Sequence, residues 1–236
     1  MQLEIVYDNN AEPGFASGWG FSCLLAGNVL FDCGEKGRPL LANLRRLEAD
    51  PENIRCVMIS HDHWDHTGGL KRLLKKKPGL PVYGCPGFGP RFFRAVREMG
   101  GRPVITEPGM EIAPGLFTSG EVAGEYKGLP MPEQALIART EKGIAVITGC
   151  SHPGIAYMVA AARRLEPDRS VELVLGGFHL KDKTEDEILQ VARKLKAVPV
   201  ARVGPTHCTG EPAAKIFRET FGNNCLPVAA GKIFEI

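Results

Sequence analysis

Short apolar runs recur along the chain at lengths typical of buried β-strands. Between several of them, apolar residues repeat every three or four positions, as on the buried face of a helix. The runs that predict strands cover residues 3–7, 20–25, 28–32, 54–60, 136–139, 144–148, 171–175, 200–203 and 231–236. Because strands and helices alternate, we predict an α/β fold with both parallel and antiparallel strands.

The predicted helices are marked by apolar stripes and by start signals. One helix covers residues 40–47, and another covers residues 153–165 with Pro153 at a first-turn position. Thr184 with a glutamate three residues later has the spacing of a capping box and predicts a third helix start. Residues 100–132 are rich in Gly and Pro and predict short strands and an active-site loop.

Composition is that of an ordinary globular protein, with 236 residues, 44% of them hydrophobic and 24% charged. No repeat or linker interrupts the chain, so we predict a single domain over residues 1–236. No apolar run approaches the roughly 20 residues that span a bilayer, and the first ten residues lack the regions of a signal peptide. We therefore expect a cytoplasmic protein without a membrane partner.

The net charge of +2 is too small to indicate a nucleic-acid partner. One dense basic run, residues 71–77, is interpreted as the solvated end of a helix. The seven cysteines are scattered, without a CxxC pair, which argues against a disulfide framework. Most are interpreted as small buried hydrophobes, but Cys150 and Cys208 lie close to histidines.

Three of the six histidines fall within residues 61–66, which have the pattern H-x-H-x-D-H. Because side chains alternate along an extended chain, His61 and His63 point to the same side. The chain then turns toward a helix, so Asp65 and His66 can face the same point. Imidazole and carboxylate groups suit Zn²⁺, Fe or Mn ions, and this segment therefore predicts a metal site.

The other three histidines repeat one arrangement, in which an apolar strand and a glycine precede His152, His179 or His207. Each could be structural if taken alone. All six histidines nevertheless follow the end of a predicted strand, and the ends of parallel strands form a rim where ligands bind. The pattern therefore predicts that the histidine side chains lie around one metal centre.

The hexapeptide followed by Thr-Gly-Gly resembles the metallo-β-lactamase superfamily, and Asp32 in Leu-Phe-Asp-Cys-Gly resembles its early Asp-x-Gly strand end. The phrases Thr-Gly-Cys-Ser-His-Pro-Gly-Ile, Gly-Gly-Phe-His-Leu and Pro-Thr-His-Cys-Thr-Gly resemble more narrowly the group named for dihydropterin–ribofuranosylaminobenzene phosphate synthase. This resemblance implies a four-layer αββα sandwich with two mixed sheets, helices outside, and metals at one edge between the sheets.

The resemblance also implies two ligand sets, one of His61, His63 and His152 and the other of Asp65, His66 and His207. One or two divalent ions are expected, with Zn as the first choice and Fe or Mn as alternatives. The usual bridging aspartate is missing, because Gly149 is followed by Cys150 and the other candidate position carries His179. Cys150 is either a soft ligand or a buried thiol, and His179 either a ligand or a substrate contact.

These features favour a metal-dependent hydrolase that uses activated water on a small, anionic or phosphorylated ester. Asp65 is the first candidate for a general base or water-orienting group, and His179 is the second catalytic candidate. The family name gives an alternative, a transferase joining a pterin to a ribofuranosylaminobenzene phosphate. A non-catalytic metal-binding or ligand-binding protein is the third interpretation. The expected partner is a small molecule and not a nucleic acid, while the oligomeric state is left open.

Overall fold

The structure is a computed structural model that describes residues 1–236. It divides into two compact units, one of residues 1–107 with 229–235 and the other of residues 108–228 with 236. Each unit has its own mixed sheet and its own helices, and each is described by itself. The single domain expected from the sequence stays a prediction.

The first unit is built on a seven-stranded sheet with the order β15-β1-β2-β3-β4-β5-β6. Its strands are β1 (Gln2–Tyr7), β2 (Ser22–Leu25), β3 (Val29–Phe31), β4 (Cys56–Met58), β5 (Pro81–Gly84), β6 (Arg102–Ile105) and β15 (Ile233–Glu235). Pairing is antiparallel from β15 to β3 and parallel from β3 to β6. Strands β2, β3 and β4 are buried at every position, which explains their continuous apolar sequences.

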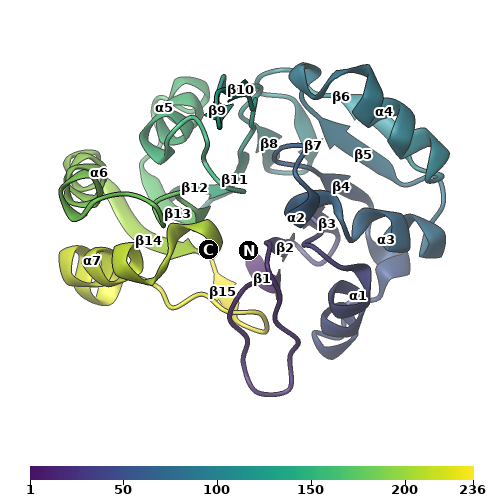
Figure 1. The fold of residues 1–236 in the computed structure, drawn as a ribbon, viewed down its shortest axis with the longest axis horizontal. Coiled ribbons are helices and arrows are strands. Elements are labelled where there is room, and N and C mark those ends of the chain that lie inside the picture. Colours follow the sequence, from purple (N-terminus) through teal and green to yellow (C-terminus); the bar gives the residue numbers. More distant parts are fainter. The chain divides into compact units, whose positions relative to one another are not determined.

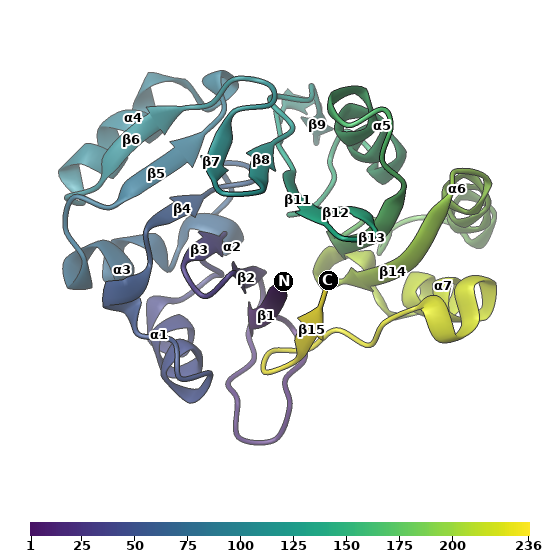
Figure 2. The ribbon, with the colours of Figure 1, turned by 180° about the vertical axis from the view of Figure 1, so that it is seen from behind.

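Three helices of this unit lie on one side of the sheet in both views (Figures 1 and 2). The unit has four helices, α1 (Gly37–Arg46), α2 (Trp64–Thr67), α3 (Leu70–Lys76) and α4 (Gly89–Glu98), and α1, α3 and α4 are the three on that side. Single 3₁₀ turns lie at Pro51–Asn53 and Pro86–Phe88. Leu40 and Leu44 of α1 and Leu73 of α3 pack with Val57 and Val82 of the sheet in one core. The basic run therefore belongs to α3, whose apolar face is buried.

The second unit contains a six-stranded sheet with the order β14-β13-β12-β11-β8-β7. Its strands are β7 (Glu111–Ala113), β8 (Leu116–Thr118), β11 (Leu136–Thr140), β12 (Gly143–Thr148), β13 (Val171–Gly177) and β14 (Val200–Thr206), with a separate hairpin of β9 (Glu125–Tyr126) and β10 (Leu129–Pro130). The helices are α5 (Ile155–Leu165), α6 (Glu185–Ala197) and α7 (Glu211–Phe221), with 3₁₀ turns at His207–Thr209 and Gly222–Asn224. Strands β12, β13 and β14 are parallel, so their carboxyl ends share one edge.

The predicted α/β class and its mixture of parallel and antiparallel strands are confirmed, and each predicted strand is present with shifted bounds. The short strands predicted in residues 100–132 are also present. The sequence analysis missed β5, α4 and α7. One detail was wrong, because Pro153 precedes α5 and the N-cap is Gly154 at φ 96°. No helix combines the length and apolar character needed to cross a membrane.

Candidate metal centre

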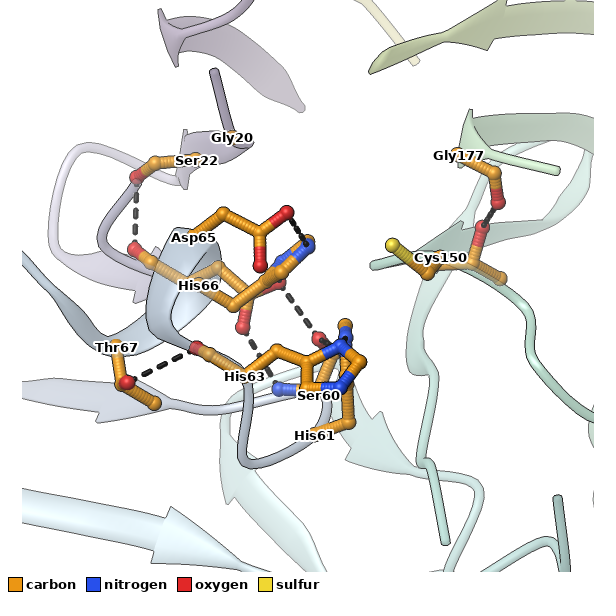
Figure 3. Close-up of polar contacts among 12 residues, drawn as sticks. Gly20, Ser22, Ser60, His61, His63, Asp65, His66, Thr67, Cys150 and Gly177 are labelled. Atoms are coloured by element: carbon orange, nitrogen blue, oxygen red, sulfur yellow. Dashed lines mark hydrogen bonds and ion pairs between the residues drawn. The ribbon is translucent and has the colours of Figure 1, made fainter. Parts of the chain in front are cut away.

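The H-x-H-x-D-H segment lies at the end of β4 and runs into the short helix α2. Nε2 of His61 lies 3.1 Å from Nδ1 of His63, and the rings of His61 and His66 are 4.2 Å apart. Oδ2 of Asp65 lies 3.8 Å from Nε2 of His66. The predicted ligands of this segment are therefore brought together (Figure 3).

Asp32, at the end of β3, holds this segment in place through a buried hydrogen-bond network. Its Oδ2 atom lies 2.6 Å from Nδ1 of His66 and accepts a 2.7 Å hydrogen bond from the Ser60 hydroxyl. Its Oδ1 atom accepts a 2.7 Å hydrogen bond from the Ser60 backbone N–H. The Ser60 hydroxyl also lies 2.8 Å from Nδ1 of His61. With both Nδ1 atoms engaged, a metal would be bound through Nε2 of His61 and Nε2 of His66.

The backbone around Asp32 depends on two glycines of the Thr-Gly-Gly sequence. A Cβ on Gly68 would lie 2.1 Å from the Glu35 carbonyl oxygen, and one on Gly69 would lie 2.1 Å from that of Cys33. These glycines thus let α2 pack directly against the segment after β3. Asp32 itself has φ 56°, a left-handed conformation that aspartate tolerates better than most residues. Burial raises the pKa of Asp32, while His66 and Ser60 oppose the shift.

The later histidines follow the three parallel strands of the second unit, as predicted. His152 follows β12, His179 follows β13, and His207 follows β14. The rings of His152 and His179 lie 4.5 Å apart, and Tyr126 of β9 meets both edge-on at 5.3 and 5.6 Å. His179 and His207 each have φ 51°. Such positive φ values in histidines cost energy and are typical of functional sites.

Glu133 plays the same supporting role here that Asp32 plays in the first unit. This fully buried carboxylate accepts hydrogen bonds from the backbone N–H groups of Cys150, Ser151 and His152 at 2.8–2.9 Å. Its Oε2 atom also lies 3.2 Å from Nδ1 of His152. Burial by itself would raise the pKa of Glu133, but these hydrogen bonds and His152 hold the pKa below its usual value.

The Cys150 thiol lies close to several other possible metal-binding side chains of this unit. Donor atoms of His152, His179, His207 and Cys208 each lie within 4.8 Å of its Sγ. The Cys208 thiol lies 3.6 Å from the Cys150 carbonyl oxygen. Although burial acts to raise the pKa of Cys208, contacts with Cys150 and the two neighbouring histidines lower it well below the usual thiol range. Sulfur and imidazole donors within this distance of one another suit a soft or borderline metal ion.

The structure thus gathers the predicted residues into two sets, each within its own unit. His61, His63, Asp65 and His66 form the first set, and Cys150, His152, His179 and His207 form the second. Sequence reasoning missed Glu133, because a single glutamate in a weakly patterned segment carries no signal before its fold is known. Trp64, which lies between His63 and Asp65 in the sequence, is 59% exposed.

The chain is similar in sequence to known proteins. Residues 23–130 match the family described as the metallo-beta-lactamase superfamily. The chain is 31% identical to the 7,8-dihydropterin-6-methyl-4-(beta-D-ribofuranosyl)-aminobenzene-5'-phosphate synthase of Methanocaldococcus jannaschii, over 88% of this chain and 84% of that protein. An uncharacterized protein of the same organism is 30% identical over 99% of this chain and its own full length.

A solved structure is similar over the whole chain. The crystal structure of Tm1679, described as a metal-dependent hydrolase of the beta-lactamase superfamily, has a TM-score of 0.85 and 30% identity. The match covers 100% of this chain and 99% of that one. The mixed sheets and flanking helices of both units therefore belong to an architecture already seen in crystals.

Proposed function

Because this chain belongs to the metallo-β-lactamase superfamily, we propose that it is a metal-dependent hydrolase acting on a small anionic or phosphorylated ester. One observation carries the proposal. Two buried carboxylates, Asp32 and Glu133, lie against the Nδ1 atoms of His66 and His152, so these histidines would bind a metal through Nε2. Burying two charged carboxylates costs free energy, so they would not stabilise a purely structural core.

The donors fit the metal that the family implies. Imidazole nitrogens with one carboxylate or thiolate are common ligands of Zn²⁺, and Fe or Mn are alternatives. We propose as ligands the residues indicated by the resemblance, with Cys150 in the role of the missing aspartate: His61, His63, Asp65, His66, His152, His207 and Cys150. When bound, such an ion would lower the pKa of a water molecule toward neutrality and would polarise the ester oxygen.

Two side chains are proposed to act on the reactants. The Asp65 carboxylate lies beside His66 and is 6% exposed, so it can orient a water molecule or accept its proton. Nδ1 of His179 is buried and has no hydrogen-bond partner in the structure. A hydrogen bond with Cys208 raises the pKa of His179 against the opposing effect of burial. His179 can therefore donate a hydrogen bond to an anionic group of the substrate.

Hydrolysis of chromogenic phosphodiesters and carboxylic esters by the purified protein tests the proposal. We expect activity that a chelator abolishes and added Zn²⁺, Fe²⁺ or Mn²⁺ restores. His61→Ala should lower the activity by more than about 100-fold, because a ligand is lost. Lys194→Gln, an exposed change on α6, should leave it unchanged. Activity that survives His61→Ala and chelation would contradict the proposal.

A transferase is the second candidate, favoured by the synthase name of the 31% identical relative. In that reaction the same residues would position and polarise two substrates, one of them a phosphorylated ribosyl compound. Binding of a pterin by the metal-loaded protein, without hydrolysis of any chromogenic ester, would favour this candidate. Metal binding with neither property would favour the non-catalytic interpretation.

A further inference from the structure

A basic hollow lies beside the first turns of α1 and α3 in the first unit. Its cationic lining consists of Lys36, Arg38, Lys71, Arg72 and Lys75. Its volume is about 630 Å³, and Glu35, the one acidic residue on its wall, lies 2.8 Å from the Lys36 ammonium group. Four cationic side chains therefore line the hollow without a carboxylate partner.

Three of these charges lie where helix dipoles disfavour them. Arg38 is in the first turn of α1, and Lys71 and Arg72 are in the first turn of α3. The amino end of a helix carries a partial positive charge, so cations there lower stability. Neither first turn contains an acidic residue. A solvated helix end explains Lys75 in the last turn of α3, but it does not explain the other three charges.

The amino end of α1 is also open to the hollow. No side chain caps it, because the N-cap position is Lys36. Gly37 allows α1 to approach α3 closely, since a Cβ there would lie 2.4 Å from the Cβ of Arg72. Unpaired N–H groups at a helix amino end, next to cationic side chains, favour the binding of a tetrahedral anion. Lys71 and Lys75 are one helical turn apart and repel each other until such an anion binds.

We propose that the basic hollow binds a small molecule carrying two or more phosphoryl groups. Guanidinium groups such as those of Arg38 and Arg72 can each hold two phosphate oxygens, and the lysines add further charge. A single-stranded nucleic acid fits less well, because no aromatic side chain lines the hollow to stack on bases. The polyphosphate could be part of a substrate or a separate effector.

Inorganic pyrophosphate is the probe, and binding to the metal-loaded protein is measured by calorimetry. We expect Lys71→Gln/Arg72→Gln to weaken binding at least tenfold, and the charge-matched control Arg193→Gln/Lys194→Gln on α6 to bind as the wild type does. If the metal bound the pyrophosphate instead, both double variants would bind it with the affinity of the wild type. Equal affinity in both double variants would therefore overturn the proposal.

The thermal midpoint of the free protein gives a second readout. Since Lys71 and Arg72 oppose the helix dipole, the Lys71→Gln/Arg72→Gln protein should melt at a higher temperature than the wild type without ligand. Pyrophosphate should then raise the midpoint of the wild type more than that of the variant. An unchanged or lower midpoint for the free variant would contradict the electrostatic argument.

Two further experiments identify the kind of molecule to which the bound phosphoryl groups belong. Competitive inhibition of ester hydrolysis by pyrophosphate, lost in Lys71→Gln/Arg72→Gln, would indicate a substrate subsite. A change in kcat alone, lost in the same variant, would indicate an effector. Tighter binding of a uridine 20-mer than of pyrophosphate, with the same dependence on Lys71 and Arg72, would overturn the small-molecule assignment in favour of RNA.

Discussion

Oδ2 of Asp32 lies 2.6 Å from Nδ1 of His66, and both side chains are fully buried. Asp32 directly follows β3, and His66 lies in α2, which follows the neighbouring parallel strand β4. Because Nδ1 of His66 is engaged by Asp32, a metal would be bound through Nε2. The same carboxylate holds Ser60, which in turn contacts His61. One acid therefore orients two of the proposed ligands.

Replacing this acid tests its role directly. Asp32→Asn keeps a side chain that tolerates the left-handed backbone at φ 56°, but it removes the negative charge that His66 faces. We expect metal affinity to fall about 10–100-fold, as is typical when a partner of a metal-bound histidine is lost. Competition titration with a chromogenic chelator measures it. Asp50→Asn, at an exposed position, is the control, and equal affinities for both variants would contradict the prediction.

Glu133 is expected to act on stability as well as on the site. In Glu133→Gln one acceptor oxygen becomes an amide donor facing backbone N–H groups of the turn after β12. Leaving buried donors without an acceptor should lower the free energy of unfolding by about 2 kcal/mol. Urea unfolding measures it, with the exposed change Glu141→Gln as the control. A loss no larger than that of the control would be evidence against this role.

The contribution of Glu133 should also depend on pH. Its pKa in the folded state lies below the ordinary value of 4.5. Its ionised form therefore stabilises the fold fully above pH 4.5, and the contribution is lost as the pH falls through the folded-state pKa. The difference in stability between wild type and Glu133→Gln should shrink in acid. A difference that stays constant from pH 7 to pH 3 would contradict this assignment.

Metal stoichiometry separates the two candidates for the missing bridging aspartate. We expect about two ions per chain in protein purified without oxygen or added metal, and the loss of one ion in Cys150→Ala. Loss of one ion in His179→Ala instead would make His179 the ligand. Cys23→Ala, which removes another buried thiol, should retain the wild-type content. One ion per chain, unchanged in all variants, would contradict the binuclear hydrolase and favour polarisation of a substrate by a single ion.

The capping box of α6 gives a prediction for stability alone. The Thr184 hydroxyl accepts a 3.4 Å hydrogen bond from the Glu187 backbone N–H, and the Glu187 carboxylate accepts a 2.8 Å bond from the Thr184 N–H. Thr184→Ala should lower the free energy of unfolding by about 1 kcal/mol. Thr220→Ala inside α7 should cost less, since alanine is the better helix former. Thermal unfolding of both variants shows which one loses more stability. A larger loss in Thr220→Ala than in Thr184→Ala would contradict the importance of the cap.

The sequence by itself determined most of the strands, although not β5, and it determined the capping box and the candidate ligands. Strands β12 and β13 are buried at every position, so their mainly apolar sequences reveal them as a local pattern. The histidines were found for the same reason, since the end of each strand is visible in the sequence. Helix α4 was missed because its buried Phe92, Phe93 and Val96 make too short a stripe.

Only the tertiary structure decided which acidic side chains contact the histidines. It also decided which cationic side chains come together in the basic hollow. Glu133 lies 19 positions from His152, and Asp32 lies 34 positions from His66. No local periodicity links residues so far apart, because their contact depends on strand order and on turns with positive φ. The basic hollow likewise joins Arg38 to Arg72 only because Gly37 lets α1 and α3 meet. Hydrophobic pattern is a local property of a chain, whereas hydrogen-bond partnership and electrostatic surroundings arise from its fold.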